Sequence, residues 1–187
     1  MPRKPRILVA GMPYHLIVRG NNRGVIFPDE DCYNRYLELL KGNKKRYNYK
    51  LYCYCLIPNH IHLLLEASLE APISKIMQSI NTSYTIYFNK KFKRTGHILE
   101  GRYKSKIIEK NGYLLHLSRY IHMNPVKAGL CRRAEDYKYS SVKYYLSAIN
   151  DGFIDSDFIL SALSDDIELA RVEYKAFLDE QFLYLAR

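Results

Sequence analysis

Tryptophan is absent from this 187-residue sequence, and cysteine, with four residues, is scarce. Four scattered cysteines are too few for the disulfide framework of a small secreted domain, so we expect reduced and mostly buried thiols. No run of about 18 apolar residues occurs, and we therefore expect no membrane span. The basic start of the sequence lacks the apolar stretch of a secretory signal. These absences predict a cytoplasmic protein.

Acidic residues are scarce over the first 130 positions. Residues 1–130 contain 22 Lys and Arg but only 8 Asp and Glu, whereas residues 131–187 contain 7 and 11. A strongly basic segment favours a polyanionic partner, and nucleic acid is the usual one. The 18 tyrosines fit two interpretations. They stack on unpaired bases beside lysines, or they fill the core beneath a basic, solvated surface.

Hydrophobic periodicity predicts the secondary structure. Alternation with period two indicates strands, and apolar residues at the 3.6-residue period indicate helices. Proline, glycine and asparagine mark the breaks between them. The predicted elements are a strand Tyr14–Arg19, a helix that begins at Asp29, strands Lys50–Ile57 and His60–Leu65 joined by Pro58-Asn59, a long helix after Pro72, a strand Arg102–Ile108, and a helix from Asn111 to about Asn124 that Pro125 ends.

The order of these elements predicts the fold class. Strand, helix, strand, strand, helix, strand, helix is typical of an α+β protein with a ferredoxin-like (RRM-like) antiparallel sheet and helices packed on one face. The acidic C-terminal part predicts two further helices, Ser156–Leu163 and Asp165–Leu183. We therefore expect a main domain over residues 1–147 and a small helical extension over residues 148–187.

The pattern His60-Ile61-His62 is the sharpest local feature. Residues two apart in a strand point to the same face, so both imidazoles can hold one divalent ion. Two ordinary strand histidines are the alternative. Cys53 and Cys55 offer a further one, because Cys55 is predicted to lie opposite His62 and the four side chains could form a zinc site. Four ligands from two adjacent flat strands fit a tetrahedron poorly, which favours buried thiols.

A second set of candidates lies further along the chain. Tyr120 and Asn124 are four residues apart and share one face of the predicted helix. A helical tyrosine by itself is more often a core or surface residue than a catalytic one.

Basic side chains form a third set, which is a candidate DNA-binding surface. Arg102, Lys104 and Lys106 share one face of their predicted strand, which is either a solvated edge or a surface that faces DNA. Arg19 and Arg23 are further candidates for DNA contact, and solvated surface charge is the alternative for all five.

Several sequence blocks together resemble one known family. Leu56-Ile57-Pro58-Asn59-His60-Ile61-His62-Leu63-Leu64 resembles the His-hydrophobic-His motif of the HUH tyrosine transposases, which act on single-stranded DNA. Gly101-Arg102-Tyr103-Lys104-Ser105, Tyr120-Ile121-x-x-Asn124-Pro125-Val126-Lys127-Ala128-Gly129 and Tyr139-Ser140-Ser141 are similar to further blocks of that family. The blocks are most similar to its REP-associated (RAYT) branch, and the resemblance spans about residues 6–147.

The resemblance implies a role for each matching residue. His60 and His62 would ligate Mg²⁺ or Mn²⁺, and Asn124 occupies the place of a polar third ligand. Tyr120 would be the nucleophile that attacks a phosphodiester, which gives a 5′-phosphotyrosine and a free 3′ hydroxyl. The implied partner is single-stranded or hairpin DNA, and the implied location is the nucleoid. Mobile relatives act as homodimers, which is one assembly open to this chain.

Two other functions fit the same residues. One is a protein that binds DNA or RNA hairpins on the same scaffold without cutting them. The other is a zinc-stabilised structural domain that uses Cys53, Cys55, His60 and His62.

The absence of any Gly-x4-Gly-Lys-Ser/Thr pattern agrees with strand joining that needs no ATP, as the transposase resemblance implies.

Overall fold

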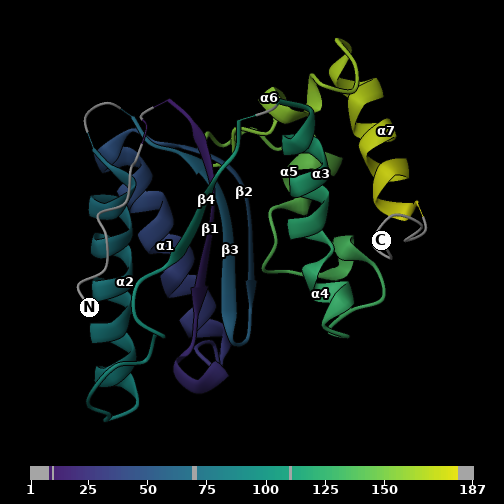
Figure 1. Ribbon diagram of the computed structural model, residues 1–187. Helices are drawn as coiled ribbons and strands as arrows, with labels where there is room; N and C mark the ends of the chain where they lie inside the picture. Colours follow the sequence, from purple (N-terminus) through teal and green to yellow (C-terminus); the bar gives the residue numbers. More distant parts are fainter. Residues whose placement is uncertain (1–8, 10, 69–70, 110, 181–187) are drawn as a thin grey trace.

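The structure is a computed structural model that describes residues 9, 11–68, 71–109 and 111–180. Its four antiparallel strands form one sheet in the order β2-β3-β1-β4 (Figure 1). The strands are β1 (Pro13–Arg19), β2 (Lys50–Ile57), β3 (His60–Glu66) and β4 (Lys104–Ile107). β1 and β3 are the central pair, and Pro58-Asn59 forms the turn of the β2–β3 hairpin, as the sequence predicts.

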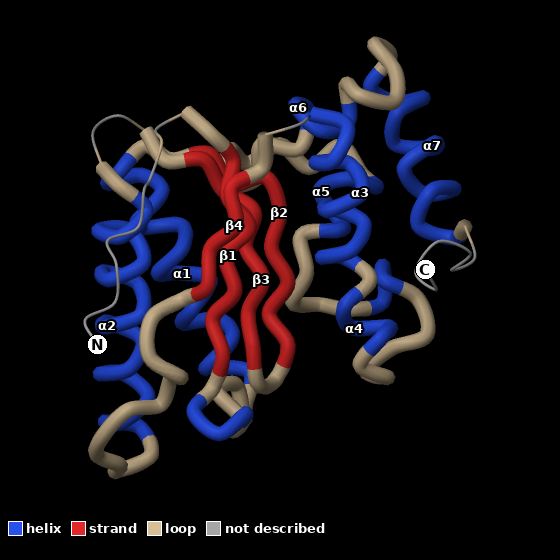
Figure 2. Tube along the Cα trace, viewed as in Figure 1, coloured by secondary structure: helices blue, strands red, loops and turns tan. Residues whose placement is uncertain are grey.

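Helices α1 (Glu30–Tyr47) and α2 (Ile73–Lys91) lie side by side on one face of this sheet (Figures 1 and 2). This arrangement confirms the predicted α+β, ferredoxin-like fold. On the other side lie α3 (Asn111–His122), α4 (Asn124–Lys127) and α5 (Val142–Leu146). Two short 3₁₀ turns, Asn21–Arg23 and Ala134–Asp136, complete this part of the chain. The predicted packing of helices on one face therefore holds for α1 and α2, whereas α3, α4 and α5 lie on the opposite face.

The two helices under the sheet begin and end at recognisable signals. The Asp29 side chain accepts a hydrogen bond from the Cys32 backbone N–H, which caps the first turn of α1. Asn48 ends α1 in the left-handed conformation, with φ of 47°. Pro72 precedes the first residue of α2. The predicted starts of both helices are therefore confirmed.

Most tyrosines belong to the core and not to a base-stacking surface. Twelve are buried. Tyr36 and Tyr84, for example, pack edge to face with ring centroids 5.1 Å apart, and both contact Phe27. The core interpretation is thus right for the majority. Of the tyrosines in the described residues, only Tyr113 and Tyr120, both on α3, are exposed.

Two predicted elements differ from the structure at their ends. β4 begins at Lys104, not at Arg102, because Gly101 adopts φ of 64° and turns the chain just before the sheet. α3 ends at His122, and α4 begins at Asn124 with Pro125 in its first turn. A proline has no N–H to continue one helix, but it suits the first turn of the next.

The C-terminal part contains α6 (Asp157–Leu160) and α7 (Ile167–Asp179). Both are shorter than predicted, and the predicted end of α7, residues 181–183, lies outside the described residues. Asp166 caps α7 by accepting from two backbone N–H groups, which fixes its start. The division of the chain after residue 147 stays a prediction. Along the described ranges, no helix has the length and apolar character needed to cross a bilayer.

A buried hydrogen-bond relay joins α7 to α3 and to the edge of β2. His122 of α3 is fully buried, and its Nδ1 lies 2.8 Å from the Tyr174 hydroxyl of α7. Its Nε2 lies 2.8 Å from Ser141 Oγ, which also accepts from the Tyr54 backbone N–H. The Tyr174 hydroxyl contacts Ser118 as well. The relay therefore holds the helix that bears Tyr120 between the extension and the sheet.

Removing the hydroxyl at the centre of this relay should destabilise the fold. In Tyr174→Phe, the buried Nδ1 of His122 loses its partner, whereas Ser118 keeps its bond to the Leu115 carbonyl, so we expect the free energy of unfolding to fall by about 1–3 kcal/mol. Tyr113→Phe is the matched control, because Tyr113 is exposed on α3 and its loss is expected to stay within about 0.5 kcal/mol. Chemical denaturation measures both, and equal losses would contradict the role of the relay.

Candidate functional site

The candidate site lies on the sheet face that α1 and α2 leave open. Residues that pair directly across antiparallel strands point to the same face. The pairing therefore collects on this face residues that are far apart in the sequence. They are His15, Ile17 and Arg19 of β1, Cys55 of β2, His60, His62 and Leu64 of β3, and Lys104 and Lys106 of β4.

The structure brings the predicted nucleophile next to the predicted metal ligands. The ring centroids of His60 and His62 are 5.0 Å apart. The Tyr120 ring of α3 lies 5.7 Å from the His62 ring, at an angle of 88°. His62 is buried, His60 is half-buried, and Tyr120 is 38% exposed. The strand and the helix thus meet at one place, which is open to solvent on the side of Tyr120.

The imidazoles present the form that binds metal ions. Burial, followed by the neighbouring His15, lowers the pKa of His62 to about 2. Burial and the Arg19 charge lower the pKa of His60 as well. Both rings are therefore neutral at pH 7, which leaves a nitrogen lone pair for coordination.

The hydrogen bonds of these histidines indicate which nitrogen is free. His60 Nδ1 donates to Asn59 Oδ1 at 2.8 Å, which leaves Nε2 without the proton. His62 Nε2 is buried and has no hydrogen-bond partner among the described residues. A buried nitrogen without a partner is unfavourable unless something else contacts it. The unpartnered Nε2 of His62 and the unprotonated Nε2 of His60 are therefore the two nitrogens that could hold a divalent ion.

Asn124 follows the end of α3, four residues after Tyr120, and its amide nitrogen is already used. Asn124 Nδ2 donates to the Tyr120 backbone carbonyl at 2.7 Å, which satisfies the end of α3. This orientation leaves Oδ1 as the group that can face a metal ion or a water. The same bond ties Asn124 to the backbone of the predicted nucleophile.

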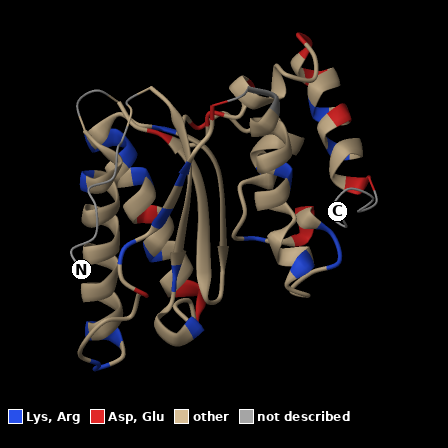
Figure 3. Ribbon diagram, viewed as in Figure 1, with Lys and Arg blue, Asp and Glu red and all other residues tan. Residues whose placement is uncertain are grey.

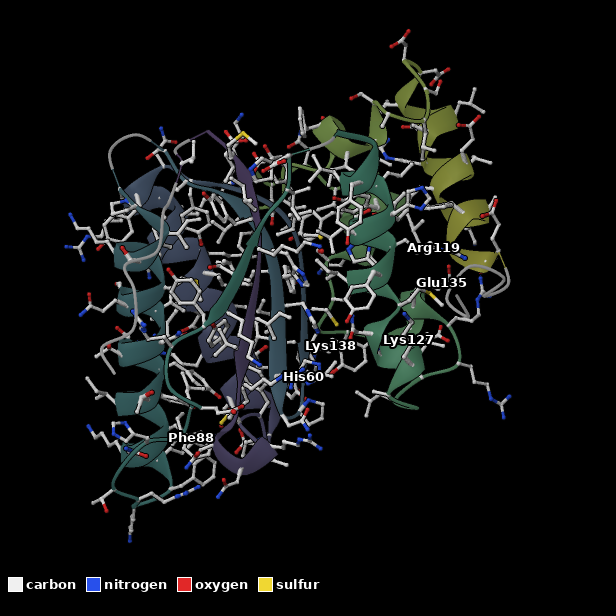
Figure 4. The ribbon with its side chains drawn as sticks, viewed as in Figure 1. His60, Phe88, Arg119, Lys127, Glu135 and Lys138 are labelled. Atoms are coloured by element: carbon white, nitrogen blue, oxygen red, sulfur yellow. The ribbon has the colours of Figure 1, made fainter. Side chains whose placement is uncertain are left out.

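Two residues near the site were not predicted from the sequence. His15 Nε2 lies 2.9 Å from His62 Nδ1, and the two rings stack with centroids 5.2 Å apart. Lys127 Nζ lies 4.6 Å from the centre of the Tyr120 ring, and Figure 4 shows Lys127 of α4 across from His60. His15 can be recognised as a neighbour of His62 only from the strand order, because the pairing of β1 with β3 brings the two residues together.

The predicted basic residues divide into two groups. Lys104 and Lys106 lie exposed on β4, and Arg19 lies directly opposite His60. Figure 3 shows basic residues, in blue, along β4. Among the described residues, none of these three pairs with a carboxylate, whereas Lys44, Lys91 and Lys138 all do.

The other two basic candidates lie outside the strands of the sheet. Arg23 lies in the turn Asn21–Arg23, with φ of 56°, next to Asn59. Arg102 precedes β4 and lines a cavity of about 520 Å³ with Ser74 and Gln78 of α2. The prediction that Arg102 shares a strand face with Lys104 and Lys106 was therefore wrong, because Gly101 delays the start of the strand.

The thiols do not assemble a zinc site. Cys55 pairs with His62 across the hairpin, as predicted, but Cys53 and Cys55 are fully buried, free thiols. Burial raises the pKa of both thiols, which disfavours the thiolate that zinc requires. No group of three or more His, Cys, Asp or Glu in the described part of the chain has the geometry for a metal ion.

Comparison with protein families identifies the relatives of this chain. A family model described as "Transposase IS200 like" matches residues 8–124, which include His60, His62, Tyr120 and Asn124. The chain belongs to the IS200-like transposase family. No curated protein matches it.

Several solved structures are similar to this chain. A REP-associated tyrosine transposase bound to a REP hairpin has a TM-score of 0.66 at 18% identity, over 84% of this transposase and 90% of that chain. A transposase candidate from Deinococcus radiodurans has a TM-score of 0.45 at 19% identity, over 64% and 95%. A bacterial tRNA(His) guanylyltransferase-like protein in complex with GTP has 0.40 at 13%, over 65% and 68%. The first likeness shows a shared fold.

The burial of the cysteines predicts their reactivity. We expect a thiol reagent to modify only the half-buried Cys131 promptly in the native transposase, and all four cysteines after unfolding. Cys131→Ser is expected to remove the native reaction. The absorbance of the chromophore that the thiol reagent releases gives the number of modified cysteines. A zinc indicator added after unfolding is expected to detect no zinc. Release of one zinc per chain would instead support the zinc-stabilised alternative.

Proposed function

We propose that this transposase cuts and rejoins single-stranded DNA in a metal-dependent reaction with Tyr120 as the nucleophile. The observation that supports this most directly is the 5.7 Å approach of the Tyr120 ring to His62. It joins a helix and a strand that are more than 50 positions apart in the sequence. The exposure of Tyr120 gives a DNA strand access to the hydroxyl.

The proposed metal ligands are His60 and His62, each through Nε2, with Asn124 Oδ1 as the third ligand directly or through water. Mg²⁺ or Mn²⁺ bound there would polarise the scissile phosphate and offset the charge that develops on its oxygens. Because imidazole is a less typical ligand for Mg²⁺ than a carboxylate, we expect Mn²⁺ to bind more tightly.

Tyr120 would carry out the covalent step. Its hydroxyl oxygen attacks phosphorus, and the bond from phosphorus to the 3′ oxygen breaks. The phenol proton passes to solvent, and the departing 3′ oxygen takes up a proton. A later attack by a 3′ hydroxyl on the 5′-phosphotyrosine reverses these changes and joins two strands. The Lys127 ammonium beside the Tyr120 ring would attract the phosphate of a bound strand.

The surface next to the site suits an unpaired strand. Lys106 Nζ lies 5.4 Å from the ring centre of Tyr113, which is exposed on α3. Lysines hold the backbone of single-stranded DNA while aromatic rings stack on its bases. The structurally similar REP-associated transposase is bound to a REP hairpin, which supports hairpin DNA as the substrate. In this proposal residues 1–147 bind and cut DNA, and residues 148–187 support α3.

Removing one oxygen from the nucleophile tests the covalent step. With Tyr120→Phe, we expect a labelled single strand that contains a hairpin to be bound but not cut, because the attacking oxygen is gone. The measurement is the covalent protein–DNA adduct seen on a denaturing gel with Mn²⁺. Tyr113→Phe is the matched control, since it removes the same oxygen from the same helix.

The outcomes of this experiment separate the candidate functions. An adduct in wild type and in Tyr113→Phe, but not in Tyr120→Phe, supports the proposal. Cleavage by Tyr120→Phe at the wild-type rate would show that another group is the nucleophile. Binding without any adduct in wild type, tested on hairpins with varied flanking strands, would favour the protein that binds hairpins without cutting them.

The basic face predicts a salt-dependent loss of affinity. We expect Lys104→Ala with Lys106→Ala to weaken hairpin binding and to reduce the slope of log affinity against log salt by about 0.7 for each lost phosphate contact. Lys45→Ala with Lys90→Ala is the matched control, because both lysines are exposed on the helices of the other face. Fluorescence anisotropy over a salt series measures both, and equal slopes would contradict the proposed DNA surface.

A further inference from the structure

A pair of histidines links the centre of the sheet to the site. His15 of β1 and His62 of β3 are diagonal neighbours, because His62 pairs with Ile17 and His15 pairs with Leu64. Both side chains are buried, and His15 Nε2 lies 2.9 Å from His62 Nδ1. The rings stack with an interplanar angle of 19°. His15 therefore touches the ligand side chain on the edge that faces away from Nε2.

A hydrogen bond between two neutral imidazoles has two arrangements. In one, His15 Nε2 donates, and His62 must then carry its own proton on Nε2. That proton would be buried without an acceptor among the described residues. In the other, His62 Nδ1 donates to the lone pair of His15 Nε2, and His62 Nε2 keeps a lone pair. Only the second arrangement avoids a buried, unpaired N–H group.

His60, the neighbouring proposed metal ligand, also donates its hydrogen bond from Nδ1. Asn59 Oδ1 can only accept, so His60 Nδ1 must donate to it. His60 then has its lone pair on Nε2. With His62 in the second arrangement, both rings keep their lone pair on Nε2.

We propose that His15 is a positioning residue that holds His62 in the Nδ1–H form and so directs the Nε2 lone pair of His62 toward a divalent cation. The identity of the ligand rests on the proposed function, whereas the state of the His62 ring does not. Residues that accept from a ligand histidine fix its orientation and its proton.

The choice of an imidazole as acceptor fits a polyanionic substrate. A carboxylate commonly occupies this position beside a ligand histidine. Here a carboxylate would place a negative charge on the face that holds Arg19, Lys104 and Lys106. Such a charge would repel the phosphates of DNA. A neutral His15 accepts the hydrogen bond without that repulsion.

The first experiment reads the protons directly in the metal-free, full-length transposase. Long-range ¹H–¹⁵N spectra of protein labelled at histidine distinguish protonated from unprotonated ring nitrogens. We expect His62 and His15 both to carry the proton on Nδ1. In His15→Leu, we expect His62 to lose this single form. A proton on His62 Nε2 in the wild-type protein would overturn the proposal.

The second experiment measures Mn²⁺ binding without DNA, by electron paramagnetic resonance. We expect His15→Leu to weaken Mn²⁺ binding about 10- to 100-fold. His15→Gln is expected to restore most of it, because the glutamine oxygen can accept where His15 Nε2 does. His97→Leu, at an exposed histidine, is the control and is expected to bind as wild type does.

The possible results distinguish a failure of this inference from a failure of the proposed function. Equal Mn²⁺ affinity in wild type and His15→Leu, or no rescue by His15→Gln, overturns the positioning role. If His15→Leu does not fold, the Mn²⁺ affinity of His15→Gln is compared with that of His15→Asn, whose side chain is shorter. Equal Mn²⁺ affinity of these two variants overturns the positioning role of His15. If wild type has the expected His62 proton but binds no Mn²⁺, the metal-dependent function fails while the ring assignment stands.

Discussion

The alternation of side chains along the central pair of strands, β1 and β3, is the constraint on which this transposase depends. One face of the pair buries Leu16, Ile61 and Leu63 against α1 and α2, and the other face presents His15 and His62. A register shift of one residue would move the imidazoles into the apolar core. The hydrophobic effect that folds the sheet therefore also sets the alignment of the histidines.

The helix that bears Tyr120 is held from the opposite side by polar contacts. His122, two positions after Tyr120, is enclosed by Tyr174 of the extension and by Ser141 at the edge of β2. Asn124 closes the end of the same helix by bonding to the Tyr120 carbonyl. Burial lowers the pKa of His122 to about 3, so this contact does not change its charge in the neutral pH range. The aromatic ring next to His62 thus has a rigid support.

The sequence predicts local features well where a strong local signal exists. β2 has the predicted bounds, because an apolar run ends at Pro58-Asn59, and α1 begins directly after Asp29, the predicted start of the helix. The His-x-His pair and Tyr120 were identified because they occur in blocks that resemble one family.

Features that depend on tertiary structure were not predictable in this way. His15 has no unusual local pattern, and its partner is 47 positions away. Arg102 was misplaced because period two cannot reveal that a glycine delays the start of the strand. The side of the sheet that α3 covers depends on packing with the extension, which periodicity does not encode.

The position of β4 in the sheet has a consequence for how this protein behaves at high concentration. β4 is one of the two outer strands of the described sheet, and Lys104 and Lys106 are exposed on it. An outer strand invites pairing with another molecule, and lysines on it discourage such self-association. The same two charges would then serve both DNA contact and colloidal stability. Substitutions that remove these two lysines to weaken DNA binding would therefore also make the protein more prone to aggregate.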